Sequence, residues 1–345
     1  MGTTSKDVAR QAGVSAATVS MVLRGRPGIS DSTRQKVLSA ADELGFQYTN
    51  LSGSKRHKII QFVIYKRHGK VVSDTPFFEH MTKGVIGCAQ RLGYQPTISY
   101  FYGTENAVEQ LRGIKTTRCA GLILLATEMC SGDLAAFESL NVPMVLLDNW
   151  FYGKSMDSVV IDNRYGAWAA TNYLIQCGHT RIGYLHSKVD IHNFVERKDG
   201  YLAAVRKLHG DNKADSAHRI VLVGTTAETA CDDMSEYLAA DPVLPTAFFA
   251  DNDHIAAGCI HALHRGGYRV PEEISIIGFD GIPVGKLLEP PLTTMSVPNE
   301  SMGALAVERL DHLIQNETGG EIIRTEVFPS IVERGSVLNL KTFQK

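Results

Sequence analysis

The feature that most constrains the fold of this chain is the alternation of short apolar runs with helical patterns after residue 58. Apolar runs of strand length occur at 59–65, 96–102, 119–126, 143–148, 158–161, 182–187, 219–223, 246–250 and 274–279. Helical patterns lie between many of them, at 77–93, 164–177, 195–209, 227–240 and 254–265. This alternation indicates parallel sheets with helices on both faces. Roughly ten such strand-and-helix units are too many for one small sheet, so we expect two doubly wound α/β lobes.

Polar and aromatic side chains cluster where these predicted strands end. Ligands of open α/β sheets bind at the carboxyl ends of the strands. Carboxylates, amides and one arginine can bind hydroxyl groups, and aromatic rings can stack on a sugar ring, so the mixture favours a saccharide over an apolar ligand. The predicted effector contacts are Phe77, Phe78, Asp148, Asn193, Arg197, Asp251, Asn252 and Asp280.

The alternative for each strand-end carboxylate is local, because such an Asp often only caps the helix that follows. Capping is the preferred interpretation for Asp253, and the two interpretations are balanced for Asp162. For Arg197 and Asp280 we favour contact with the ligand.

A different pattern occupies the first 46 residues, where three short helices are expected. Thr4 and Asp7 have the spacing of a capping box, and Gly13 ends the first helix. Ser15 can cap a second helix with Val19, Val22 and Leu23 on one side. Ser30 or Asp31 can cap a third helix that Gly45 closes. Two helices joined by a tight turn, with a third completing a small core, predict a helix-turn-helix unit, with an ordinary three-helix surface bundle as the alternative.

In a helix-turn-helix unit the second helix enters the major groove of DNA. Ala16 and Ala17 would then touch thymine methyl groups, while Ser15, Thr18 and Ser20 could donate to phosphates. The full set of predicted DNA contacts is Thr4, Ser15, Ala16, Ala17, Thr18, Ser20, Met21, Arg24, Arg34 and Leu51.

The distribution of charge supports DNA as a partner. Residues 1–58 hold nine Lys or Arg and four acidic residues, a net charge of +5, whereas the remainder has a net charge of −7. A basic segment on a larger acidic body suits the neutralisation of phosphates.

The stretches "DVARQAGVSAATVSMVLRG" and "ISDSTRQKVLSAADELGF" resemble the DNA-binding domain of the lactose-repressor/galactose-repressor family of bacterial transcription regulators. The resemblance continues through "VIDNRYGAWAATNYLIQCGHTRIGYL", "NDHIAAG" and "ISIIGFD". It implies a body of the periplasmic-binding-protein type, a homodimer, and an effector in the cleft between two lobes. Asp148, Arg197, Asn252 and Asp280 resemble the residues that contact the ligand in sugar-responsive members of the family. The family's hinge helix inserts a Leu into the minor groove, and here only Leu51 could do so.

These observations predict a helix-turn-helix domain at 1–48, a hinge or linker at 49–58, and an effector-binding and dimerisation domain at 59–345. We expect one lobe to comprise approximately 59–161 with 292–325, and the other 162–291 with 326–345.

Other sequence features argue against other classes of protein. No apolar run approaches the roughly 20 residues of a membrane span, and the N-terminus lacks an apolar signal segment, so we expect a cytoplasmic protein without membrane contact. The six scattered cysteines are expected to be buried thiols. His254, His261 and His264 share a helix face but have no carboxylate or Cys at ligand spacing, so we expect no metal. No motif of an enzyme or a cofactor site occurs.

The sequence therefore predicts a DNA-binding transcriptional repressor of carbohydrate-utilisation genes, which binds operator DNA and a saccharide effector. The alternatives are a regulator of the same fold controlled by a nucleobase or a partner protein, and a sugar-binding protein without a DNA role.

Overall fold

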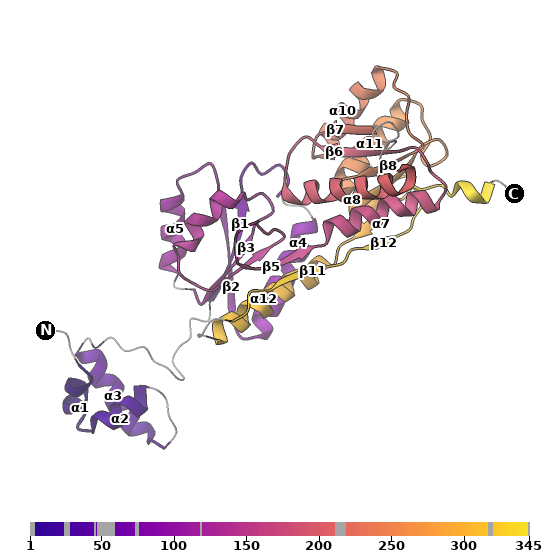
Figure 1. The fold of residues 1–345 in the computed structure, drawn as a ribbon. Coiled ribbons are helices and arrows are strands. Elements are labelled where there is room, and N and C mark those ends of the chain that lie inside the picture. Colours follow the sequence, from indigo (N-terminus) through magenta and orange to yellow (C-terminus); the bar gives the residue numbers. More distant parts are fainter. Residues whose placement is uncertain are drawn as a thin grey trace. The chain divides into compact units, whose positions relative to one another are not determined.

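A computed structural model describes residues 4–23, 28–44, 46, 59–72, 76–117, 119–210, 219–316 and 320–343 (Figure 1). The chain divides into two compact units, which we call the head (residues 1–58) and the body (residues 59–345) and describe separately. Among the described residues, no helix has both the length and the apolar character that a membrane span requires.

The head contains the three predicted helices, α1 (Ser5–Ala12), α2 (Ala16–Leu23) and α3 (Asp31–Glu43). The capping box is confirmed, because the Asp7 carboxylate accepts hydrogen bonds from the backbone N–H and the hydroxyl of Thr4 at 2.9 and 2.6 Å. Gly13 ends α1 with a φ of 65°, in the left-handed region that favours glycine. Ser15 Oγ accepts from the backbone N–H of Thr18 at 3.0 Å and caps α2.

Small aliphatic side chains form the core of the head. The buried members are Val8, Ala9, Val19, Val22, Leu23, Val37, Ala40 and Ala41, which come from all three helices. The helix-turn-helix fold predicted from the sequence is confirmed in these residues. Gly45, the predicted end of α3, lies outside the described residues.

Within the described ranges, the body forms two six-stranded sheets. The first has the order β11-β5-β4-β3-β1-β2, and every pairing in it is parallel. Its strands are β1 (Ile59–Lys66), β2 (Gln95–Tyr102), β3 (Gly121–Leu125), β4 (Met144–Leu147), β5 (Asp157–Ile161) and β11 (Arg324–Val327). The helices of this first lobe are α4 (Pro76–Arg91), α5 (Ala107–Thr116), η1 (Ser131–Asp133), α6 (Leu134–Glu138) and α12 (Asn299–Gln315).

The second sheet has the order β12-β10-β9-β8-β6-β7, and only the pairing of β10 with β12 among these strands is antiparallel. Its strands are β6 (Ile182–Ser187), β7 (Arg219–Val223), β8 (Ala247–Ala250), β9 (Ser275–Asp280), β10 (Thr293–Ser296) and β12 (Ser330–Val332). The helices of this second lobe are α7 (Asn163–Gln176), α8 (His192–His209), α10 (Ala227–Ala239), α11 (Asp253–Arg265), η2 (Pro283–Lys286) and η3 (Leu340–Phe343).

Helices cover both faces of each sheet because the strands are apolar on both sides. In β1, Ile60 and Phe62 belong to the cluster that includes residues of α4 and α12, whereas Val63 and Tyr65 pack with residues of α5 and α6. The predicted α/β class with two doubly wound lobes is confirmed.

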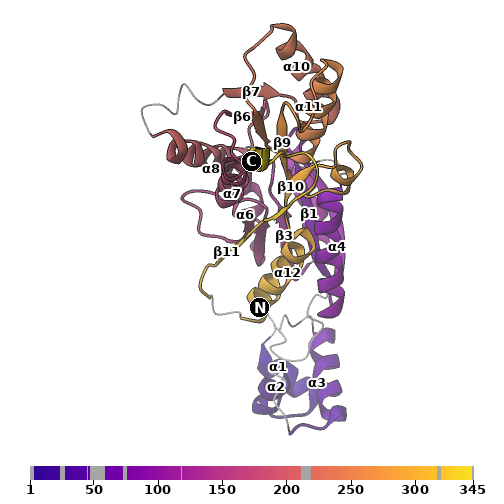
Figure 2. The same ribbon diagram turned by 90° about the vertical axis from the view of Figure 1, so that its right-hand side faces the viewer.

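The two lobes are built from interleaved segments of the chain. The chain passes between them after β5, after β10 and after β11. Figures 1 and 2 show α4 and α12 side by side, although they come from opposite ends of the body. They approach closely, because a Cβ added at Gly84 would collide with the backbone carbonyl of Glu300.

Several boundaries differ from the expectation. The strand at 293–296 pairs with β9 in the second sheet, whereas the sequence analysis placed 292–325 in the first lobe. Residues 326 and 327 pair with β5 in the first sheet, beyond the expected limit at 325. α8 begins at His192 rather than at residue 195. Cys130 is exposed, contrary to the expectation of buried thiols, while the other five cysteines are buried.

Candidate functional site

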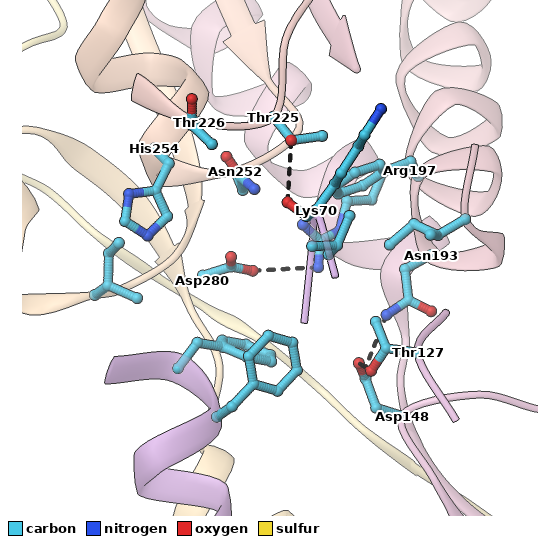
Figure 3. A pocket seen from close by; sticks show the side chains of 16 residues that line it. Lys70, Thr127, Asp148, Asn193, Arg197, Thr225, Thr226, Asn252, His254 and Asp280 are labelled. Carbon is cyan, nitrogen blue, oxygen red and sulfur yellow. Dashed lines mark hydrogen bonds and ion pairs between the residues drawn. The ribbon is translucent and has the colours of Figure 1, made fainter. Parts of the chain in front are cut away.

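A cavity lies at the carboxyl ends of the strands of both sheets (Figure 3). Its volume is about 140 Å³. An engineered cavity of roughly 150 Å³ holds one benzene molecule, so this space fits a ligand with one six-membered ring. It is lined by Lys70, Val71, Phe77, Phe78, Thr127, Asp148, Ile191, Asn193, Phe194, Arg197, Thr225, Thr226, Asn252, His254, Asp280 and Ile282.

The cavity brings together seven of the eight residues predicted to contact an effector. They are Phe77, Phe78, Asp148, Asn193, Arg197, Asn252 and Asp280. Phe77 and Phe78 come from the first turn of α4, and their rings pack edge to face with centroids 4.9 Å apart. Asn193 and Arg197 lie one turn apart on α8, which requires the earlier start of that helix.

Asp251 is the exception, and its placement corrects the prediction. It follows β8 as expected, but its side chain is fully buried and does not line the cavity. The carboxylate accepts from the Tyr184 hydroxyl and from the backbone N–H of Ser187 at 2.7 Å, and lies 2.8 Å from His186 Nδ1. These partners hold it inside the second lobe. A position at the end of a strand therefore does not by itself decide whether a carboxylate points into the cavity or into the interior of the lobe.

Arg197 is held at the centre of the cavity wall with 2% of its surface exposed. Its Nε donates to Asn163 Oδ1 at 2.9 Å, and its Nη1 donates to the carbonyl of Asp251. The guanidinium carbon lies 3.7 Å from the centroid of the Phe279 ring. Nη2 lies 3.2 Å from Asp280 Oδ1. This network fixes the orientation of the guanidinium before any ligand arrives.

Asp280 ends β9 in an unusual backbone conformation, with a φ of 103°. Its buried Oδ1 makes an ion pair with Arg197 but has no well-aligned hydrogen-bond donor among the described residues. Burial raises the pKa of the carboxyl to about 7, although Arg197 opposes the shift. Strained backbone and an unsatisfied acid together are typical of functional sites.

Asp148 resembles Asp280 in environment and backbone. It follows β4 with a φ of 65°, and its carboxylate accepts from the Thr127 hydroxyl at 2.7 Å and from Asn193 Nδ2 at 3.0 Å. Burial raises its pKa to about 6. Asn193 comes from the second lobe, so this contact joins the two lobes across the cavity.

The opposite end of the cavity carries the side chains of Thr225, Thr226, Asn252 and His254 (Figure 3). Asn252 caps α11, because its Oδ1 accepts from the backbone N–H of Ile255 at 2.9 Å. Burial lowers the pKa of His254, so its ring is neutral at pH 7. Its buried Nε2 has no hydrogen-bond partner in the described part of the chain. This nitrogen is therefore available to a ligand.

Sequence reasoning missed nine of the lining residues: Lys70, Val71, Thr127, Ile191, Phe194, Thr225, Thr226, His254 and Ile282. Thr127, Thr225 and Thr226 follow strands, so a stricter use of the strand-end rule would have found them. His254 lies two residues after Asn252 and was weighed only as a metal ligand. His261 and His264 are exposed elsewhere on α11.

Lys70 and Val71 reach the cavity because Glu128 organises the loop that follows β1. The buried Glu128 carboxylate accepts from backbone N–H groups at 67, 68, 69, 71 and 72, over 2.8–3.0 Å. Burial alone would raise the pKa of Glu128, but these N–H groups together lower it. The loop also contacts the second lobe, where the Thr225 hydroxyl donates to the Lys70 carbonyl at 3.0 Å.

The charge of the lining favours a neutral ligand. Its cations are Lys70 and Arg197, and its carboxylates are Asp148 and Asp280. Arg197 is already engaged, and the Lys70 side chain points away from Asp280 (Figure 3). An anionic ligand would face both carboxylates, whereas hydroxyl groups can donate to them. Among the described residues, no group of His, Cys, Asp and Glu is arranged to hold a metal ion.

In the head, the outer face of α2 carries the predicted base contacts. Ala16 and Ala17 are exposed, and Met21 is partly exposed, while Val19, Val22 and Leu23 face the core. Ser20 is partly exposed on the same helix.

Other predicted phosphate contacts have local partners. The hydroxyl of Ser15 lies 2.8 Å from that of Thr18, and the Thr4 hydroxyl donates to Asp7. Arg34 Nη1 lies 3.5 Å from the carbonyl of Val22 and links α3 to the end of α2. Arg24, Leu51 and the predicted hinge at 49–58 lie outside the described residues.

Comparison with known families agrees with this division of the chain. Residues 4–48 match the model described as bacterial regulatory proteins, lacI family. Residues 171–337 match the model of a periplasmic binding protein-like domain.

Similar proteins cover nearly the whole chain. The "HTH-type transcriptional regulator GalR" of Escherichia coli is 36% identical over 341 residues, which cover 97% of this chain and 95% of that protein. The "Ribose operon repressor" of the same species is 31% identical over 339 residues, covering 96% and 99%.

Solved structures show the same architecture. A "transcriptional regulator CelR-cellobiose complex" has 27% identity and a TM-score of 0.71, with 97% of this chain and 99% of that chain covered. A lac repressor dimer bound to operator and the anti-inducer ONPF has 24% identity and a TM-score of 0.69, covering 98% and 100%.

Proposed function

The chain belongs to the lacI family of bacterial regulatory proteins, and from this premise we propose that it is a DNA-binding repressor of carbohydrate-utilisation genes. Its effector is a small neutral saccharide that binds in the cavity between the lobes. It acts in the cytoplasm, as a homodimer, by binding rather than by catalysis.

The observation that best supports a saccharide effector is the set of side chains that line the cavity. Two carboxylates that are largely shielded from water, an arginine fixed on an aromatic ring, and two asparagines surround a space for one ring. Such groups bind hydroxyls in defined directions, while Phe77 and Phe78 supply an apolar surface for the C–H groups of a sugar. The relative named as a ribose operon repressor and the similar structure in complex with cellobiose support the same class of ligand.

DNA binding rests on the head. The exposed face of α2 can enter the major groove, with Ala17 and Met21 one turn apart against the bases. The net charge of +5 in residues 1–58 supplies affinity for phosphates that does not depend on base sequence.

The effector controls the protein by changing the relation of the two lobes. The cavity is lined from both lobes, and Asp148 and Thr225 each bond across it. A ligand that bridges the lobes binds one arrangement better than the other, which is the condition for an allosteric shift. In a dimer, a small change of lobe angle displaces two heads that must reach half-sites one helical turn apart.

The test uses the full chain and a body that begins at residue 59. Selection from a random DNA pool identifies the operator, and gel-shift titrations then measure affinity with D-galactose, D-ribose, cellobiose or guanine present. We expect one saccharide to change operator affinity at least about tenfold, guanine to have no effect, and affinity to fall steeply with salt. The truncated body should bind the saccharide but not the operator. A truncated body that binds the operator, or a response to guanine alone, would refute the proposal.

A further inference from the structure

A second cavity adjoins the first at the end occupied by Thr127 and Asp148. Thr127 and Ile191 line both cavities, so the two spaces are neighbours on either side of these residues. The second cavity has a volume of about 350 Å³ and is also lined from both lobes, by residues after β1, β3 and β4 and by the start of α8. A ligand longer than one sugar ring that extended past Thr127 and Ile191 would enter this second space.

One wall of the second cavity is an aromatic platform formed by Trp150, Tyr152 and His192. The ring centroids of Trp150 and Tyr152 are 4.4 Å apart, and those of Trp150 and His192 are 5.2 Å apart, both in edge-to-face geometry. Trp150 Nε1 donates to Glu196 Oε1 at 3.2 Å, and the Arg324 guanidinium lies 4.1 Å from its ring centroid. The indole is thus held from several sides.

Tyr152 differs from its neighbours because 77% of its surface is exposed. Val195, one turn after His192 on α8, also lines this cavity and is 46% exposed. The Tyr152 ring packs on the fixed indole and exposes its outer surface to water. A ligand that covers this surface gains binding free energy. An exposed aromatic ring and an exposed aliphatic side chain in one cavity suit the flat C–H face of a sugar.

Polar groups border this platform. The Arg67 guanidinium is fixed by Asp133, with Nη2 and Oδ2 2.6 Å apart, and Ser131 and Asp190 are exposed at the rim. These groups can bind ring hydroxyls directly or through water. A peptide or nucleic-acid partner would need a larger and more continuous surface than this small, partly open space offers.

We propose that the second cavity is a subsite for the second sugar ring of a disaccharide effector, with Tyr152 as its stacking residue. This inference rests on the proposed function and names the class of saccharide. The first ring lies against Arg197 and Asp280, and the glycosidic bond passes Thr127 and Ile191. A monosaccharide occupies only the first cavity.

Calorimetric titration of the full chain compares D-galactose and D-glucose with lactose, melibiose and cellobiose. We expect one disaccharide to bind at least about tenfold more tightly than either of its component sugars. Tyr152→Ala should remove about tenfold of the disaccharide affinity and leave monosaccharide affinity within about twofold. Tyr152→Phe keeps the ring and should retain the affinity. Val243→Ala, an exposed apolar position outside both cavities, is the matched control.

The outcomes separate this inference from the function on which it rests. Monosaccharides that bind as tightly as every disaccharide would overturn the subsite and leave the saccharide effector intact. Equal losses of monosaccharide and disaccharide affinity in Tyr152→Ala would likewise overturn it. If no sugar of the panel binds, the saccharide effector is wrong and the subsite falls with it.

Discussion

At the scale of single residues, the cavity contains two carboxyl groups whose surroundings disfavour the charged form. Asp148 is buried and only 13% of the Asp280 side chain is exposed, and their pKa values are raised to about 6 and about 7. A carboxyl whose pKa is raised by folding stabilises the protein fully below its ordinary pKa near 3.8, and that contribution is lost as the pH rises through the folded value. At neutral pH without effector, the Asp148 and Asp280 carboxylates are therefore stabilised by binding a proton or a hydrogen-bond donor of a ligand.

Asp280→Asn should separate binding from stability. The amide keeps the shape but loses the charged acceptor, so saccharide affinity should fall about ten- to a hundredfold. Without effector, the variant should melt at a higher temperature than the wild type at pH 8, and this gain should be smaller at pH 5, because the effect disappears only below the ordinary pKa near 3.8. Calorimetric titration and thermal melts at both pH values measure these effects. Asp199→Asn, at an exposed ion pair with Arg164, is the control and should change neither. Unchanged affinity in Asp280→Asn would remove this carboxylate from the site.

Effector binding by the wild type should depend on pH in the same range. Sugar hydroxyls donate to the charged carboxylates, so affinity should rise from pH 5 to pH 8 as Asp148 and Asp280 lose their protons. Binding at pH 6.5 should release protons, which calorimetry detects as a heat that varies with the ionisation enthalpy of the buffer. A binding heat that is equal in phosphate and Tris buffers, together with constant affinity, would contradict this prediction.

At the scale of elements, the loop at 67–72 depends on one distant side chain. Glu128→Gln replaces an acceptor of five backbone N–H groups in this loop with an amide that carries its own donors. Hydrogen bonds to a charged group each contribute about 1.5–3 kcal/mol, so we expect a loss of about 3 kcal/mol or more in the free energy of unfolding.

Because Lys70 and Val71 line the cavity, Glu128→Gln should also weaken effector binding. Denaturant unfolding and calorimetric titration measure the two effects. Glu138→Gln, in an ion pair at the surface, serves as control. A variant with wild-type stability would show that the carboxylate does not hold the loop.

The recognition helix allows a prediction about base specificity. Ala17→Arg on α2 should change the selected operator sequence, because a guanidinium can pair with guanine and discriminate by about 1–3 kcal/mol at one base step. Ser39→Arg places the same charge on the exposed surface of α3 and should only raise affinity for all DNA. Selection from a random pool with both variants distinguishes these effects. Identical motifs from Ala17→Arg and the wild type would exclude α2 from the major groove.

Most strands and helices of the body between residues 59 and 280 could be predicted from the sequence because apolar periodicity records which faces are buried, but α5, α6, α12 and β10–β12 were not predicted. The same pattern, with the strand-end rule, located Asp148, Asn252 and Asp280 in the cavity. It failed for Asp251, whose direction is decided by Tyr184 and His186 on a neighbouring strand. It also gave no sign that Glu128 would bring the loop at 67–72 to the site, since that contact joins segments about 60 residues apart.

At the scale of the whole molecule, one edge of the body is suited to join two copies. β2 is the edge strand of the first sheet, and Ile98, Tyr100 and Tyr102 on one of its faces are exposed. The rings of Tyr100 and Tyr102 stack with centroids 6.4 Å apart, and Lys66 Nζ lies 4.8 Å from the centre of Tyr100. An uncovered apolar edge strand favours association with another chain, so we predict that the proposed homodimer forms through this edge.

Tyr100→Asp should therefore dissociate the dimer, because it puts a charge in the middle of an apolar contact. Sedimentation velocity should show a monomer, while saccharide affinity stays within about twofold of the wild type, since Tyr100 does not line the cavity. Two linked heads bind two half-sites with an avidity of about 10²–10⁴ over one head, so operator affinity should fall by at least about a hundredfold. Val243→Asp adds the same charge at an exposed site away from β2 and should leave the dimer intact. A dimeric Tyr100→Asp protein with full operator affinity would place the interface on another surface.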